Sequence, residues 1–140
     1  MKTLKSLEKL AVDANPILSA LIGGSAKEVF IKAEGTSFYT TSFNFKEVEK
    51  YIPILSIKRE IPSEDLYLIL STLPIFVCNE GFYKDSIKKA KTLIAKRDPD
   101  DVHILALSLT LQCPIWSNDK DFENLGIKVY NTLDLIKCID

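Results

Sequence analysis

The stretch Leu10-Ala11-Val12-Asp13-Ala14-Asn15-Pro16 passes from a short apolar run, through an acidic residue, to a helix start. Three consecutive apolar residues are typical of a strand that is covered on both faces. Asn15 before Pro16 predicts an N-cap followed by proline at the first helical position, where no amide hydrogen is needed. A buried strand that leads into a helix is typical of a parallel sheet with crossover helices.

The same alternation continues along the chain. Further apolar runs predict strands at 38–41, 75–77, 115–116 and 128–130. Periodicity and start signals predict helices at 16–22, 25–33, 44–51, 62–73, 82–95 and 100–111. Ser25 is expected to cap the second helix, and Pro53 is expected to terminate the third. We therefore expect a single α/β domain over residues 1–140 with a five-stranded parallel sheet.

Composition indicates a globular domain. The chain is 46% hydrophobic and 26% charged, and 18 Lys+Arg against 19 Asp+Glu give a formal charge of −1, which excludes a disordered chain. No apolar run approaches the roughly 18 residues of a membrane span, and charged residues interrupt the first ten. No membrane association is expected, and the cytoplasm is the expected location. Cys78, Cys113 and Cys138 are expected to be reduced, buried thiols.

Acidic residues gather where predicted strands end and where predicted helices begin. They are Asp13, Glu47, Asp98, Asp100, Asp101, Asp119 and Asp121. Four separate chain segments contribute them. Because ligands of open parallel sheets bind beyond the carboxyl ends of the strands, we expect these carboxylates to meet at one edge of the sheet.

Taken singly, each acid also has a structural explanation. Asp98 followed by Asp101 resembles a capping box, and acids in a first turn are favoured by the helix dipole. Asn118 or Asp119 can cap the next short helix. Glu47 can be a solvent-facing charge. The convergence of the whole set is what points to a site.

Asp101 is the acid that best separates the capping interpretation from the site interpretation. Helical spacing aligns it with Ile104 and Leu105, so its side chain is expected to face the core and not solvent. Two carboxylates about 4 Å apart repel each other by roughly 4 kcal/mol at an effective dielectric of 20. Protonation or a hard cation would relieve this repulsion. Since the chain has a single histidine, His103, an oxygen-only cluster favours Mg²⁺ or Mn²⁺ over zinc. These ions suit phosphodiester hydrolysis, which the pattern therefore predicts.

These motifs resemble those of the PIN-domain nucleases, which include ribonuclease toxins of the VapC type that pair with a small antitoxin. The resemblance rests on Val12-Asp13-Ala14-Asn15, Glu47, Asp98-Pro99-Asp100-Asp101 and the segment 117–122, in that order. It spans about residues 9–135. It implies a three-layer α/β/α fold with strand order 3-2-1-4-5, an RNA substrate, Mg²⁺ or Mn²⁺ as cofactor, a homodimer and an antitoxin partner.

The resemblance also implies roles for individual residues. The catalytic and metal-binding acids would be Asp13, Glu47, Asp101 and Asp119, with Asp121 as a further ligand. Asp98 or Asp100 would compete with Asp101. Asn15, Ser117 and Asp98 would support the acids, although the family most often has threonine where Ser117 stands. Lysines that flank these positions are expected to contact the substrate backbone; they are Lys46, Lys50 and Lys120.

A second interpretation is a non-catalytic RNA- or protein-binding module on the same scaffold. The formal charge of −1 leaves room for it, because nucleic-acid binders are often basic. The densest cationic stretch, 84–97, suits either phosphate contacts or a solvated helix face. Trp116 and Phe122 are expected to belong to the core.

Overall fold

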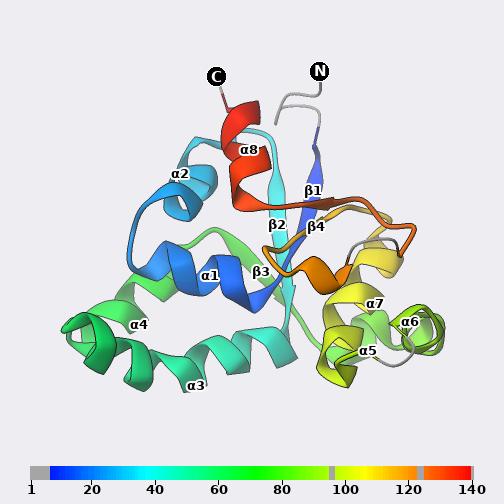
Figure 1. Ribbon diagram of the computed structural model, residues 1–140, viewed down its shortest axis with the longest axis horizontal. Helices are drawn as coiled ribbons and strands as arrows, with labels where there is room; N and C mark the ends of the chain where they lie inside the picture. Colours follow the sequence, from blue (N-terminus) through cyan, green and yellow to red (C-terminus); the bar gives the residue numbers. More distant parts are fainter. Residues whose placement is uncertain (1–6, 95–96, 123–124, 140) are drawn as a thin grey trace.

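The computed structural model describes residues 7–94, 97–122 and 125–139. Its five strands form one parallel sheet in the order β3-β2-β1-β4-β5 (Figure 1). The strands are β1 (Lys9–Val12), β2 (Ser37–Thr41), β3 (Ile75–Cys78), β4 (Ile115–Trp116) and β5 (Val129–Tyr130). The predicted fold class, strand positions and strand order are confirmed.

Helices cover both faces of the sheet (Figure 1). The α-helices are α1 (Ala14–Leu21), α2 (Ser25–Lys32), α3 (Ser42–Arg59), α4 (Ser63–Thr72), α5 (Glu80–Tyr83), α6 (Ile87–Ile94), α7 (Val102–Leu111) and α8 (Thr132–Cys138). The 3₁₀ helices within the described ranges are η2 (Lys84–Ser86), η3 (Pro99–Asp101) and η4 (Lys120–Phe122). None of the helices among the described residues is long and apolar enough to span a membrane.

The alternation of side chains along β1 separates two cores. Leu10 and Val12 face the core that is shared with α1, α2, α3, α4 and α8. Ala11 faces the opposite core, which is built from α5, α6 and α7. Trp116 lies in the first core and Phe122 in the second, as expected. This arrangement is the three-layer α/β/α sandwich that the resemblance implies.

The predicted start of α1 was wrong by two residues. The N-cap is Asp13, not Asn15, because Asp13 has extended backbone and its carboxylate accepts a hydrogen bond from the Ala14 amide at 2.9 Å. Pro16 then lies in the first turn of α1. Backbone N–H groups in a first turn have no acceptor within the helix, so the N–H that proline lacks costs no helical hydrogen bond. Ser25 is likewise the first residue of α2, and the cap is Gly24 with φ 86°.

Pro53 does not terminate the third helix, contrary to the prediction, since α3 runs on to Arg59. A proline at position 53 cannot donate to the carbonyl of Glu49, four residues earlier. The Tyr67 hydroxyl of α4 lies 3.4 Å from that carbonyl and donates to it instead. Burial of Ile52 and Leu55 on either side of the proline further stabilises the continuous helix.

The predicted helix over 82–95 is interrupted. It covers the end of α5, η2 and the whole of α6, because two side-chain hydroxyl groups contact α7; residue 95 lies outside the described residues. Tyr83 contacts His103 at 2.8 Å, and Ser86 contacts Thr110 at 2.8 Å. The three cysteines are free thiols, as expected, but they are half-buried instead of buried.

Candidate active site at the carboxyl ends of the strands

A pocket of about 300 Å³ lies at the carboxyl end of β1. Its lining comes from the start of α1, the first turns of α3 and the segment around η3. The lining residues are Asp13, Ala14, Asn15, Leu18, Asn44, Glu47, Tyr51, Asp98, Asp100 and Asp101. Five carboxylates from three chain segments therefore share one hollow, at the edge of the sheet where the sequence predicts them.

Three hydrogen bonds hold the Asp13 carboxylate in place. Its Oδ1 accepts from the Ala14 amide at 2.9 Å and from Asn44 Nδ2 at 3.3 Å, and its Oδ2 accepts from Ser117 Oγ at 2.8 Å. Burial nevertheless raises the pKa of Asp13 above 3.8, against the opposing hydrogen bonds, and the charge of Asp119 raises it further. The ionised carboxylate is therefore under-stabilised, which a cation in the pocket would correct.

Glu47 lies in the second turn of α3, because that helix begins earlier than predicted. Its side chain is exposed and its Oε1 accepts from Asn44 Nδ2 at 3.3 Å. Desolvation raises the pKa of Glu47 above 4.5, and the negative charges of Asp100, Asp13 and Asp98 raise it further. The acids of the pocket thus act on one another electrostatically.

Asp101 is half-buried and its Oδ2 is shielded from solvent. Asp101 lies three and four positions before Ile104 and Leu105, which are both fully buried, on the same side of the helix. The predicted orientation of its side chain toward the core is therefore confirmed. Asp98 both lines the pocket and caps η3, since its carboxylate accepts from the Asp100 amide at 3.0 Å. For Asp98, the capping role and a place in the site are therefore compatible.

Asp119 lies at the margin of this arrangement and does not belong to the pocket lining. It is exposed, and its backbone amide donates to Ser117 Oγ, the hydroxyl that donates to Asp13. Ser117 therefore links the fourth acid to the first. Asn15 lines the pocket and accepts from Asn118 Nδ2 at 3.5 Å. The side chain of Asp121 falls outside the described residues.

The family model of the PIN domain matches residues 11–137 of this chain. The chain belongs to the PIN-domain family. Members of this family are generally nucleases that depend on a divalent metal.

The PIN domain also resembles a solved structure, that of VapBC2 from Rickettsia felis bound to a DNA fragment from their promoter. The TM-score is 0.63 at 14% sequence identity, and the match covers 88% of this chain and 98% of that one. At this identity the likeness shows a shared fold. No match was found among curated proteins.

The donor set of this PIN domain suits a hard divalent cation. Every titratable group that lines the pocket, other than Tyr51, is a carboxylate. Within the described residues, no three Asp, Glu, His or Cys side chains are already arranged to hold a metal ion. Mg²⁺ typically takes one or two protein carboxylates and completes its shell with water and substrate phosphate. The carboxylates of the pocket therefore fit a metal ion that keeps part of its coordination shell for water and substrate.

The predicted substrate lysines stand outside the pocket, whereas Asn44, which was not predicted, lines it. Lys46, Lys50 and Lys120 are exposed and stand outside the pocket lining. Asn44 was not predicted, yet it is buried and touches both Asp13 and Glu47. Its one sequence signal is its place three residues after Thr41, the position that a capping box fills with Glu or Gln.

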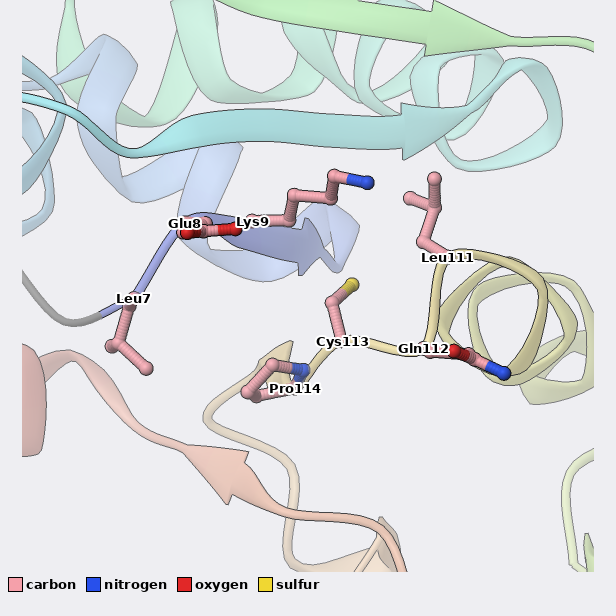
Figure 2. A pocket seen from close by; sticks show the side chains of 7 residues that line it. All are labelled: Leu7, Glu8, Lys9, Leu111, Gln112, Cys113 and Pro114. Carbon is pink, nitrogen blue, oxygen red and sulfur yellow. The ribbon is translucent and has the colours of Figure 1, made fainter.

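A second pocket, of about 320 Å³, lies at the opposite end of the sheet (Figure 2). It is lined by residues that precede or begin β1 and by the connection between α7 and β4. They are Leu7, Glu8, Lys9, Leu111, Gln112, Cys113 and Pro114. Desolvation raises the pKa of the Cys113 thiol to about 11, so this cysteine is protonated and unreactive at neutral pH.

Proposed function

We propose that this PIN domain is a metal-dependent endoribonuclease that hydrolyses RNA phosphodiester bonds. One observation carries the proposal: Asp13, Glu47 and Asp101, distant in sequence, line a single pocket at the carboxyl edge of the sheet. Such a pocket repels an RNA phosphate unless a cation is present, so a divalent ion and a phosphodiester are complementary occupants.

The residues that would hold Mg²⁺ or Mn²⁺ are Asp13, Glu47, Asp101 and Asp119, with Asp121 as a further ligand. When bound, such an ion activates water and stabilises the leaving oxygen of the phosphodiester. Ser117 and the Ala14 amide orient the Asp13 carboxylate. Asp98 fixes the turn that places Asp101.

Substrate contacts would come from the rim of the pocket. Lys46 and Lys50 lie on the same helix as Glu47, and Lys120 follows Asp119 directly. Their exposed ammonium groups would pair with RNA phosphates on either side of the scissile bond. Asn15 lines the pocket and contacts Asn118. This contact would help to keep α1 and the segment after β4 together.

The same proposal extends to the biological setting. The protein would be a toxin that pairs with a small antitoxin protein, acts as a homodimer and works in the cytoplasm. The fold that it shares with the VapBC2 structure supports the pairing with an antitoxin. The competing candidate is a non-catalytic RNA- or protein-binding module. It is favoured by the absence, among the described residues, of a preformed cluster of metal ligands and by the marginal place of Asp119.

The test is cleavage of single-stranded RNA by the purified protein with Mn²⁺, with Mg²⁺ and with EDTA. We expect cleavage with either ion, none with EDTA, and a loss of at least about 100-fold in Asp13→Asn. Glu8→Gln is the matched control, since it makes the same carboxylate-to-amide change at the other end of the sheet. Full activity of Asp13→Asn would refute the proposal, and RNA binding without cleavage in any divalent ion would favour the binding module.

A further inference from the structure

We infer that Asn44 is a positioning residue whose side-chain amide bridges Asp13 and Glu47 and sets the separation of these two carboxylates for the cation. The inference rests on the proposed function. Asn44 lies in the first turn of α3 and is only 3% exposed. It is therefore a buried polar group placed between two acids of the pocket.

The Asn44 amide nitrogen is equidistant from the two acids. Nδ2 lies 3.3 Å from Asp13 Oδ1 and 3.3 Å from Glu47 Oε1. A side-chain amide carries two N–H donors, so each carboxylate can receive one. Both bonds have a charged acceptor, which makes them stronger than bonds between neutral groups.

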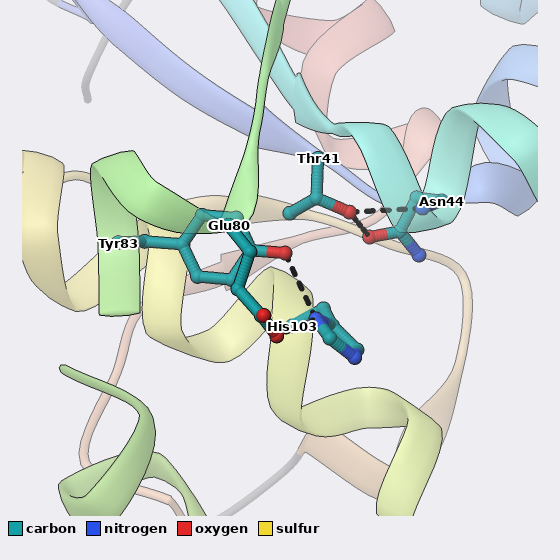
Figure 3. Close-up of polar contacts among 5 residues, drawn as sticks. All are labelled: Thr41, Asn44, Glu80, Tyr83 and His103. Atoms are coloured by element: carbon teal, nitrogen blue, oxygen red, sulfur yellow. Dashed lines mark hydrogen bonds and ion pairs between the residues drawn. The ribbon is translucent and has the colours of Figure 1, made fainter. Parts of the chain in front are cut away.

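Thr41 fixes the direction in which this amide points. The Thr41 hydroxyl donates to Asn44 Oδ1 at 2.5 Å and accepts from the Asn44 backbone amide at 2.9 Å (Figure 3). A flipped amide would turn Oδ1 toward two carboxylates. An ionised carboxylate can accept hydrogen bonds but cannot donate one, so Oδ1 would have no donor there. The contact with Thr41 therefore commits both N–H groups to Asp13 and Glu47.

The surroundings of Thr41 hold this arrangement in place. Phe43, next to Asn44, stacks on His103 with ring centroids 4.2 Å apart. His103 Nδ1 in turn contacts the Tyr83 hydroxyl at 2.8 Å (Figure 3). The first turn of α3 is thus braced against α5 and α7, and a rigid support of this kind preserves site geometry.

The chemistry of an amide suits this place. A lysine between Asp13 and Glu47 would neutralise the carboxylates and exclude a metal ion by charge repulsion. A neutral donor reduces the repulsion between the two acids and leaves their negative charge available to a cation. Asn44 can therefore hold the pair together before the ion binds.

The first test is Mn²⁺ affinity without RNA, measured by titration for the full chain. Asn44→Ala should weaken Mn²⁺ binding by about tenfold or more, as loss of a group that orients metal ligands typically does. Asn131→Ala is the matched control, since Asn131 caps α8 in a capping box with Asp134 and is absent from the pocket lining. It should retain wild-type Mn²⁺ affinity. Equal affinity in Asn44→Ala and wild type would overturn the inference.

A second pair of variants tests the orientation of the amide. Thr41→Val removes the hydroxyl that holds Asn44 Oδ1, whereas Thr41→Ser keeps it. We expect Mn²⁺ affinity to fall in Thr41→Val and to stay close to wild type in Thr41→Ser. If the two variants bind Mn²⁺ equally well, the hydroxyl does not position the amide.

A double-mutant cycle separates this inference from the proposed function. Unfolding of the metal-free wild type, Asn44→Ala, Glu47→Ala and the double variant should show coupling of about threefold or more in the unfolding equilibrium constant. Additive effects would contradict the bridge. If the wild type neither binds Mn²⁺ nor cleaves RNA, the proposed function fails, and the cycle still decides whether Asn44 links the two acids.

Discussion

The two ends of the central sheet carry pockets of similar volume, about 300 Å³ and about 320 Å³, with different chemistry. The pocket at the carboxyl ends of the strands has five carboxylates in its lining. The charged residues that line the amino-end pocket are Glu8 and Lys9, which are adjacent in sequence and opposite in charge. Pocket volume therefore does not select the site; the convergence of like charges does.

Topology explains the difference. At the carboxyl end, β1 delivers Asp13 directly, and α3 and η3 begin at the same edge, so acids from separate segments meet there. At the amino end, the chain enters the strands from α7 and from the segment before β1. The following substitutions test whether function resides at one end only.

The largest expected effect distinguishes acids within the carboxyl-end pocket. Asp101→Asn should lower kcat/KM for RNA cleavage by about 100-fold, because Asp101 lines the pocket with a shielded oxygen. Asp119→Asn should cost about tenfold, because the Asp119 carboxylate is exposed and stands outside the pocket lining. Steady-state kinetics in Mn²⁺ measure both losses, and the reverse ranking would move the centre of the site toward β4.

Metal binding should stabilise the protein through the same end of the sheet. Mn²⁺ at 100 times its dissociation constant adds about 2.7 kcal/mol to the free energy of unfolding. The melting temperature should therefore rise in the wild type and in Glu8→Gln, and stay constant in Asp13→Asn, at matched ionic strength. An equal rise in all three proteins would place the bound ion elsewhere.

Without metal, the pocket acids should reduce stability. The native pKa of Asp13 is raised above 3.8, so the folded state loses stability as the pH rises from 3.8 to that native value, and the full penalty is present above it. Asp13→Asn should therefore be more stable than the wild type at pH 7, by about 0.5–2 kcal/mol. The gain should vanish below pH 3.8. Denaturant unfolding in EDTA across this range checks the sign, and a loss of stability at pH 7 would contradict it.

The smallest expected effect lies at the amino end. Gln112 ends α7 in the left-handed conformation, with φ 53°. Gln112→Gly should raise the free energy of unfolding by about 0.5 kcal/mol, because relief of backbone strain exceeds the entropic cost of glycine in the unfolded chain. RNA cleavage should be unchanged. A loss of activity in this variant would tie the amino end to function.

The sequence predicts the architecture well because the strands are short apolar runs with clear ends. Each of the five appears where it is expected, and the edge of the sheet at which acids gather follows from their order. Helix limits are predicted less well, since they depend on contacts between distant residues. Pro53 is tolerated inside α3 because Tyr67, from the next helix, supplies the missing donor.

The limits of site prediction have the same physical origin. Acidic residues after strands are visible in the sequence, whereas the marginal place of Asp119 depends on the path of the chain beyond β4. Asn44 is an ordinary polar residue in the sequence. Its importance arises from contacts with Asp13, 31 positions away, and with Thr41, which only the folded chain brings together.

The most direct test of the central claim is an anomalous difference map from crystals grown with Mn²⁺ and a non-cleavable RNA. Our account predicts a peak in the carboxyl-end pocket, within coordination distance of the Asp13 carboxylate. An empty carboxyl-end pocket, at an Mn²⁺ concentration that supports cleavage, would contradict it.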